Sequence, residues 1–211
     1  AAGGVNVYDR MKNRFPHFRS DQNTPRGLSE NDVWALQEDQ TGALWIGTYG
    51  GGLNRYDHST GEFIHYLHDP RVPSSLSHNN VISLAVSRTG ELWVGTEGGG
   101  LERLDAASRK FAHYRHDPRD SASLIQNEVT VLHEDSSGTL WIGTNGGGLD
   151  RLDASRRIFS HYPPEENSPT ALPAGTVLSL LEDSEGYIWV GTYGGGLARL
   201  DPATEYRKSV G

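Results

Sequence analysis

Hydrophobic and polar positions along the chain follow a pattern that repeats every 48 residues. A tryptophan, an aliphatic residue and a phenylalanine keep this register from copy to copy. They are Trp45, Trp93, Trp141 and Trp189; Val5, Leu53, Leu101, Leu149 and Leu197; and Phe15, Phe63, Phe111 and Phe159. A period of this length is close to the roughly 40–50 residues of propeller blades. The chain therefore contains four copies of one unit and part of a fifth.

Each unit divides into four short segments with the composition of strands, separated by turn residues. In the copy that begins at Val33, the segments are 33–39, 43–48, 53–57 and 63–68. The second of them, ALWIGT, is apolar throughout, as expected of a strand that stacked sheets cover on both faces. No segment has the i, i+3, i+4 apolar spacing of an amphipathic helix.

The pattern predicts an all-β fold, a β-propeller built of four-stranded antiparallel blades. A stacked β-solenoid is the alternative, but its coils are usually shorter than this unit. We expect residues 1–211 to form a single propeller domain or propeller segment. Its expected parts are a partial blade at 3–19, blades at about 33–68, 81–116 and 129–164, and an incomplete blade at about 177–201.

The phase of the repeat predicts an unusual pair of ends. The chain starts with a third and a fourth strand, at 3–9 and 15–19, and its last predicted strand is another third strand at 197–201. The last blade is therefore expected to borrow its outer strand from the N-terminal segment or to lack one. If the ring closes within one chain, 3–9 and 197–201 compete for one place. If it does not, further propeller blades or a second copy of the chain would cover the exposed edges.

Composition excludes several classes of partner and site. The formal net charge is −8 and no Lys/Arg cluster offsets it, which argues against nucleic acid. No apolar run reaches the ~18 residues that a membrane span needs, so we expect no membrane insertion by this segment. The chain has no cysteine. Its repeated histidines fall on different blades, where we expect a polar edge facing solvent, so we predict no metal site and no cofactor.

The spacing Asp-x-x-Gly-x-x-Trp, seen at Asp39, Gly42 and Trp45, resembles the Asp box of sialidase-type propellers, which is a structural turn. We therefore expect structural roles for the residues of this box, namely Asp39, Asp135, Asp183, Trp45, Trp93, Trp141 and Trp189. The second copy has Ser87 in place of the aspartate. No carboxylate stands apart from the repeat as a placed acid or base, so we predict no catalytic residue.

Candidate ligand-binding residues are those that differ between copies and yet belong to one face. One such residue precedes each glycine triplet, and the loop before each first strand adds an asparagine in three copies. The candidates are Tyr49, Glu97, Asn145, Tyr193, Asn31, Asn79 and Asn127. Both connections of an up-and-down blade emerge on the same face, where aromatic and amide groups suit sugar recognition. Plain loop variation, and for the asparagines a role in shaping the start of the blade, are the alternatives.

The phrase EDQTGALWIGTYGGGLNRYDHSTGEFIHYLHDP resembles the two-component regulator propeller repeat, and EDSSGTLWIGTNGGGLDRLD and EDSEGYIWVGTYGGGLARLD repeat the match. The resemblance covers essentially the whole chain. It implies an extracytoplasmic sensor region of a bacterial membrane protein, whose signalling half is commonly a hybrid histidine kinase and sometimes a diguanylate cyclase. It also implies ligands that are often oligosaccharides.

These observations predict a non-catalytic ligand-binding sensor propeller, periplasmic or extracellular, that recognises an oligosaccharide. The chain opens inside the repeat, so we expect it to be a piece of a longer protein, whose output domain would carry any enzymatic activity. Two alternatives stay open. One is a propeller lyase or glycosidase acting on glycans, and the other is a structural scaffold for protein partners.

Overall fold

The structure is a computed structural model that describes residues 3–8, 11, 17–21, 26–155, 158–165, 168 and 171–202, together with the backbone of 207–210. Every regular element within these ranges is a strand. Four sheets of four strands and one pair of strands account for all of them. No helix in the described part of the chain is long and apolar enough to cross a membrane.

Each four-stranded sheet, here called a blade, comes from one copy of the repeat. Blade 1 contains β3 (Val33–Glu38), β4 (Leu44–Thr48), β5 (Gly52–Asp57) and β6 (Glu62–Tyr66). Blade 2 contains β7 (Val81–Val86), β8 (Leu92–Thr96), β9 (Gly100–Asp105) and β10 (Lys110–Tyr114). Blade 3 contains β11 (Val129–Glu134), β12 (Leu140–Thr144), β13 (Leu149–Leu152) and β14 (Phe159–Tyr162). Blade 4 contains β15 (Val177–Glu182), β16 (Ile188–Thr192), β17 (Gly196–Leu200) and β18 (Arg207–Val210).

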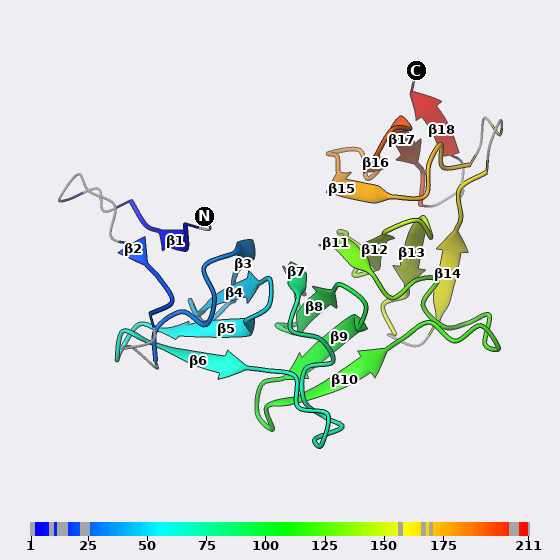
Figure 1. The fold of residues 1–211 in the computed structure, drawn as a ribbon. Coiled ribbons are helices and arrows are strands. Elements are labelled where there is room, and N and C mark those ends of the chain that lie inside the picture. Colours follow the sequence, from blue (N-terminus) through cyan, green and yellow to red (C-terminus); the bar gives the residue numbers. More distant parts are fainter. Residues whose placement is uncertain are drawn as a thin grey trace.

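The strands of every blade pair antiparallel in chain order, which confirms the predicted blade architecture. Neighbouring first strands contact one another along the inner side: β3 with β7, β7 with β11, and β11 with β15. The fourth strands lie outermost. Figure 1 shows the blades as an open arc, with blades 1 and 4 at its two ends.

Two results at the ends of the chain differ in part from the expectation. β1 (Val5–Asn6) and β2 (His17–Phe18) pair as the predicted third and fourth strands, although residues 9, 15 and 16 of those predicted segments lie outside the described residues. The expectation that blade 4 lacks an outer strand of its own is wrong, because β18 pairs with β17. The repeat pattern does not predict this strand, because Arg207 occupies the position at which the other copies have phenylalanine.

The core lies in the joints between blades. Trp45 packs on blade 2, Trp93 on blade 3 and Trp141 on blade 4, and all three are buried. Trp189 of blade 4 is only half-buried, since no described blade follows it. Burial of all four tryptophans was expected, and the fourth departs from it for this reason.

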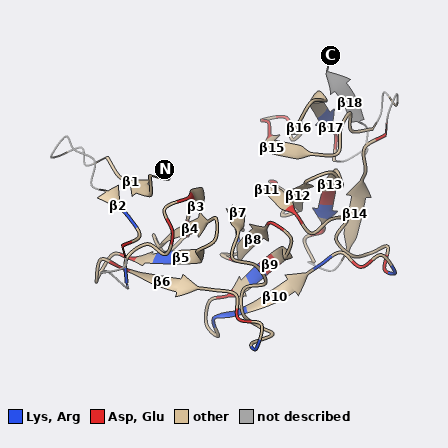
Figure 2. Cartoon of the chain, viewed as in Figure 1, with Lys and Arg blue, Asp and Glu red and all other residues tan. Residues whose placement is uncertain are grey.

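A glycine two residues after each tryptophan sets how closely the blades approach. A Cβ atom added at Gly47 would lie 2.6 Å from Cγ1 of Val81 in the next blade, and one at Gly95 would lie 2.6 Å from Cγ1 of Val129. Any larger residue would therefore push the blades apart. Arginines of the third strands, which Figure 2 shows on β5, β9 and β13, lie beside these joints. The Arg55 guanidinium, for example, is 5.9 Å from the centre of the Trp45 ring.

The predicted Asp-box turns form as expected. Asp135 Oδ1 accepts hydrogen bonds from the backbone N–H groups of Ser137 (2.9 Å) and Thr139 (3.0 Å), and Oδ2 accepts one from Trp141 Nε1 (2.7 Å). Burial alone would raise the pKa of Asp135, but hydrogen bonds led by those from Ser137 and Trp141 hold it below its usual range. Asp39 and Asp183 bind the indoles of their own blades in the same way. The turn thus fixes the tryptophan that fills the joint.

Replacing Trp141 by alanine should therefore open a cavity in the joint between blades 3 and 4. We expect Trp141→Ala to lower the free energy of unfolding by ~3–5 kcal/mol, measured by urea titration. Trp189→Ala is the matched control and should cost clearly less, because its ring is half-exposed. A loss under ~1 kcal/mol for Trp141→Ala would show that this tryptophan is not part of the core.

Candidate functional site

The two loops that were expected to share one face do lie together in each blade. The residue before each glycine triplet donates its backbone N–H to the carbonyl of the residue that precedes the first strand of the same blade. These pairs are Tyr49 with Asp32 (2.8 Å), Glu97 with Asn80 (3.0 Å), Asn145 with Glu128 (3.0 Å) and Tyr193 with Thr176 (2.8 Å). Each blade therefore contributes one such pair to the face.

Backbone contacts also join these loops from one blade to the next. The N–H groups of Gly50 and Gly52 bond the carbonyl of Asn79 in blade 2, and Tyr49 and Asn80 form an isolated β-bridge. The joint between blades 2 and 3 repeats this, with a bridge between Glu97 and Glu128. The loops thus form one continuous surface, here called the loop strip, made of Asp32, Tyr49, Asn80, Glu97, Glu128, Asn145, Thr176 and Tyr193.

Side chains of the strip are linked across the joint between blades 1 and 2. Asn80 Nδ2 donates to Glu97 Oε2 at 2.6 Å, and the Tyr49 hydroxyl hydrogen-bonds the same carboxylate. On its other side, the Tyr49 ring lies 5.6 Å from the ring of Trp34 on β3. The exposed fraction of Trp34 is 58%, which is high for so large an apolar side chain. An aromatic pair therefore stands next to a fixed carboxylate.

Contacts within blade 3 and across the joint between blades 3 and 4 hold the amide of Asn145 in a single orientation. Asn145 Nδ2 donates to Glu128 Oε1 at 2.8 Å, and Asn145 Oδ1 accepts from Thr176 Oγ1 at 2.8 Å. Tyr193 completes the strip on blade 4, where its exposed fraction is 74%. Each of the four residues that precede the glycine triplets thus lies beside a residue of the loop before the first strand of its own blade.

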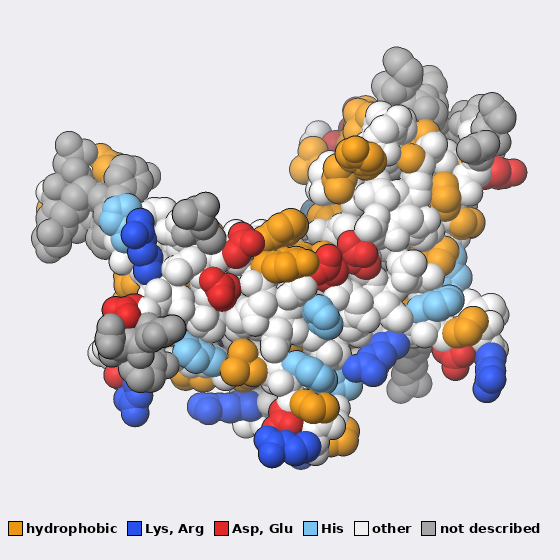
Figure 3. Space-filling model, viewed as in Figure 1, with side chains coloured by type: hydrophobic (Ala, Val, Ile, Leu, Met, Phe, Trp, Pro, Cys, Tyr) orange, Lys and Arg blue, Asp and Glu red, His pale blue; other side chains and the backbone are white. Residues whose placement is uncertain are grey.

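The charge of the strip is negative. Hydrogen bonds from Asn80 and Tyr49 hold the pKa of Glu97 below its ordinary value, so this carboxylate is ionised at neutral pH. The hydrogen bond to Glu97 and the nearby charges of Glu97, Glu128 and Asp32 raise the pKa of Tyr49. Figure 3 shows acidic side chains on both sides of a hydrophobic group along the inner side of the arc.

The three predicted asparagines have a different position. Their Oδ1 atoms accept backbone N–H groups just beyond the fourth strand of the preceding blade; the pairs are Asn31 with Ser20 (2.8 Å), Asn79 with His68 (2.8 Å) and Asn127 with His116 (2.7 Å). These bonds shape the start of each blade. Gly175 replaces the asparagine in blade 4, where a Cβ atom would lie 2.3 Å from the carbonyl oxygen of Gly146. The strip, and not these asparagines, forms the candidate site.

Buried acid–histidine pairs between the third and fourth strands were missed from the sequence. In blade 3, His161 Nδ1 lies 2.7 Å from Asp150 Oδ1, and its Nε2 bonds the Ser121 carbonyl. The expectation of histidines on a solvent-facing edge is therefore wrong for this blade. Burial lowers the pKa of His161, but its bond to Asp150 outweighs burial and raises the pKa above its ordinary value. The sequence signal for these pairs is the residue that follows Gly-Leu on the third strand. It is acidic in blades 2 and 3 (Glu102 and Asp150), whereas blades 1 and 4 have Asn54 and Ala198 there.

In blade 2 the acid of the pair is Glu102, which is completely buried. Its Oε1 accepts the Ser77 N–H at 2.9 Å, and its Oε2 lies 3.3 Å from His113 Nδ1. His113 Nε2 faces the Pro73 carbonyl and must carry a proton there, which leaves Nδ1 as an acceptor when the ring is neutral. Burial raises the pKa of Glu102 to about 8, so the protonated carboxyl is the form that suits this site.

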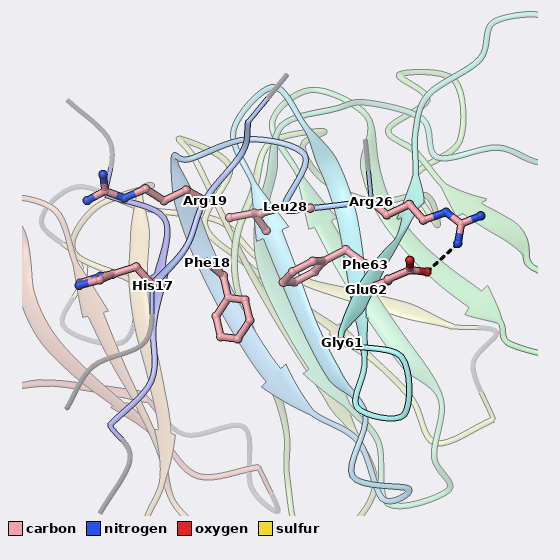
Figure 4. A pocket seen from close by; sticks show the side chains of 9 residues that line it. His17, Phe18, Arg19, Arg26, Leu28, Gly61, Glu62 and Phe63 are labelled. Carbon is pink, nitrogen blue, oxygen red and sulfur yellow. Dashed lines mark hydrogen bonds and ion pairs between the residues drawn. The ribbon is translucent and has the colours of Figure 1, made fainter. Parts of the chain in front are cut away.

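A cleft of about 530 Å³ lies on the outer side of the arc, between β2, the loop at 26–28 and β6. Figure 4 shows Phe18 and Phe63 pointing toward one another in it, with the Arg26–Glu62 ion pair (2.8 Å) at its edge. Its lining contains none of the strip residues. No group of three or more His, Asp or Glu side chains in the described ranges is arranged to hold a metal ion.

The repeat and the fold both match known proteins. A family model described as two component regulator propeller matches residues 27–50, 75–98, 123–146 and 171–194. The extracellular domain assigned to the hybrid two component system BT3049 from B. thetaiotaomicron is 29% identical, with a TM-score of 0.82 over 98% of this chain and 27% of that chain. The extracellular domain assigned to the one component system BT4673 from the same organism is 24% identical, with a TM-score of 0.76 over 99% and 28%.

The chain thus spans about a quarter of the length of these two extracellular domains. Virginiamycin B lyase from Staphylococcus aureus is 14% identical, with a TM-score of 0.67 over 96% of this chain and 61% of that chain. At this identity the likeness concerns the fold alone. No curated protein matches the chain.

The buried acid in blade 2 makes stability depend on pH in a definite direction. Because burial raises the folded-state pKa of Glu102 to about 8, above an unfolded value of about 4.3, its favourable contribution is complete below the unfolded value. That contribution is lost as the pH rises through about 8. Glu102→Gln should therefore flatten the decline in unfolding free energy between pH 5 and about 8, measured by urea titration.

The exposed carboxylate of Glu62 provides the control for this prediction, and Glu62→Gln should leave the decline unchanged. An equal decline with pH in wild type and Glu102→Gln would contradict the assignment.

Proposed function

Because this chain belongs to the two component regulator propeller family, we propose that it is the non-catalytic, ligand-binding part of a bacterial sensor. The proposed ligand is an oligosaccharide bound along the loop strip. The observation that carries the proposal is the exposed Trp34–Tyr49 pair beside the fixed carboxylate of Glu97. Sugars present apolar ring faces and hydroxyl groups together, so they need an aromatic surface next to oriented hydrogen-bonding groups.

The order of the strip supports binding of an extended ligand. Tyr49, Glu97, Asn145 and Tyr193 come from four successive blades, so a chain of sugar units would meet a phenol, a carboxylate, an amide and a second phenol in turn. Asn80 and Glu128 hold the Glu97 carboxylate and the Asn145 amide in place before binding, which lowers the entropy cost of recognition. The negative charge of the strip favours a neutral oligosaccharide over a sulfated or otherwise anionic one.

We place the site in the periplasm or outside the cell, since both similar domains are extracellular. Signal output by a histidine kinase or a diguanylate cyclase would then belong to other parts of the whole protein. A lyase or glycosidase remains the competing function, and it would require a placed acid and base at the strip. Turnover of a glycan by the purified chain would favour that competitor.

Removing the aromatic surface should weaken binding. We expect Trp34→Ala and Tyr49→Ala each to reduce affinity about 2- to 10-fold, the equivalent of roughly 0.5–1.5 kcal/mol per aromatic contact, for oligosaccharides that bind the wild type. Isothermal titration calorimetry against a panel of neutral and sulfated oligosaccharides measures this. Tyr193→Ala should act in the same direction, more weakly for short ligands.

The control is His58→Ala, an exposed ring on the turn between β5 and β6, at the opposite end of the strands from the strip. It should leave affinity unchanged. Undiminished binding after both Trp34→Ala and Tyr49→Ala, or chemical-shift changes confined to the His58 side, would remove the strip from consideration.

A further inference from the structure

Two glutamates face one another at the joint between blades 2 and 3. Glu97 and Glu128 form an isolated antiparallel β-bridge, and both residues are half-buried. Residues directly opposite one another in such a bridge have Cβ atoms ~4.5–5.5 Å apart, and like charges at these positions repel. The equivalent bridge of the preceding joint pairs Tyr49 with Asn80, which are both neutral. The joint between blades 2 and 3 therefore has an acid pair where its neighbour has uncharged groups.

The contacts of this acid pair leave part of each carboxylate able to accept further hydrogen bonds. Glu97 accepts from Asn80 Nδ2 and from the Tyr49 hydroxyl, and Glu128 accepts from Asn145 Nδ2. Since an ionised carboxylate has about four acceptor positions, roughly two remain on Glu97 and roughly three on Glu128. Among the residues that the structure describes, no Lys or Arg forms an ion pair with either glutamate. The charge of the pair is therefore not offset by the donors that hold it.

The negative potential of the acid pair extends to the aromatic pair of the strip. The raised pKa of Tyr49 has its largest cause in the hydrogen bond to Glu97, and the charges of Glu97, Glu128 and Asp32 add to it. These carboxylates come from three different blades. On the face shown in Figure 3, no Lys or Arg side chain lies between the acidic groups that flank the hydrophobic group. The aromatic surface and the acid pair together suit a ligand that is both sugar-like and positively charged.

We propose that the oligosaccharide bound by the strip carries a free amino group, whose ammonium ion lies between the carboxylates of Glu97 and Glu128. A primary ammonium has three N–H donors for the open acceptor positions, and its charge relieves the repulsion within the pair. A neutral sugar hydroxyl could donate a hydrogen bond there but could not offset the charge. The assignment rests on the proposed function, since it names the class of sugar bound at the same site.

A calcium ion is the other cation that two carboxylates attract. Calcium takes about 6–8 oxygen ligands. No group of three or more His, Asp or Glu side chains in the described part of the chain is arranged to hold a metal ion. An ammonium ion needs only three acceptors, which the acid pair supplies. The pair therefore fits an amino sugar better than a metal ion.

Probes that differ in a charged amino group test the proposal. Isothermal titration calorimetry at about pH 7, where amines of this kind are largely protonated, compares glucosamine and galactosamine oligosaccharides with their N-acetylated forms. We expect the free amines to bind about 5-fold tighter, the upper end of the range for a single surface ion pair. Added salt should reduce this preference, because it screens the charges.

Variants distinguish the effect of charge from the fit of the acetyl group. Glu97→Gln and Glu128→Gln each keep a side-chain oxygen that can accept from the neighbouring asparagine, but they remove one charge. Each should therefore reduce the preference for the free amine to about 2-fold or less. Glu38→Gln is the matched control, because it removes an exposed charge at the opposite end of β3 from the strip. It should leave the preference unchanged.

Three results would overturn the amino-sugar assignment. They are equal or tighter binding of the N-acetylated or other neutral oligosaccharides, a preference that survives both substitutions, and a preference that requires added calcium. If the neutral forms bind and their binding depends on Trp34 and Tyr49, the proposed function still stands and only this assignment falls. If no oligosaccharide of either kind binds, both are wrong.

Discussion

The close approach of neighbouring blades is the constraint on which the rest of the structure depends. Each blade is too thin to have a core of its own, so its apolar faces must be covered by the blades on either side. Two residues of the Trp-x-Gly sequence on the second strand make this close approach possible. The indole fills the joint, and the glycine lets the first valine of the next blade touch the backbone. The Asp-box turn then fixes the indole through its Nε1 atom in blades 1, 3 and 4.

The same joints create the candidate site. Because the glycine triplet of one blade bonds the loop of the next, residues 48 positions apart in the sequence become neighbours on one surface. A repeat would by itself give a surface with the same group on every blade. The differences among Tyr49, Glu97, Asn145 and Tyr193 turn it into an arrangement of unlike groups, which is what selective recognition requires. In the proposed function, architecture and specificity would thus belong to different positions of one unit.

Much of this follows from the sequence. The 48-residue period, the four segments per unit and the Asp box are local patterns, and they predicted the blades, the order of their strands and the face that carries the loops. Strand β18 was missed because it lacks the repeated phenylalanine at Arg207, so only pairing with β17 reveals it. The partial exposure of Trp189 and the acid–histidine pairs were also missed, since both depend on what lies across a joint or between strands. The asparagines were assigned to the ligand face, but their oxygen atoms bond the backbone instead.

The joints between blades hold the loop strip as one rigid surface. Hydrogen–deuterium exchange at the amides of Gly50, Gly52, Gly98 and Gly100 tests it directly, because each donates to a carbonyl of the next blade. These amides should exchange as slowly as those in the second strands, and more slowly still when a ligand binds the strip. Fast exchange at these glycines, with the second strands still protected, would contradict it.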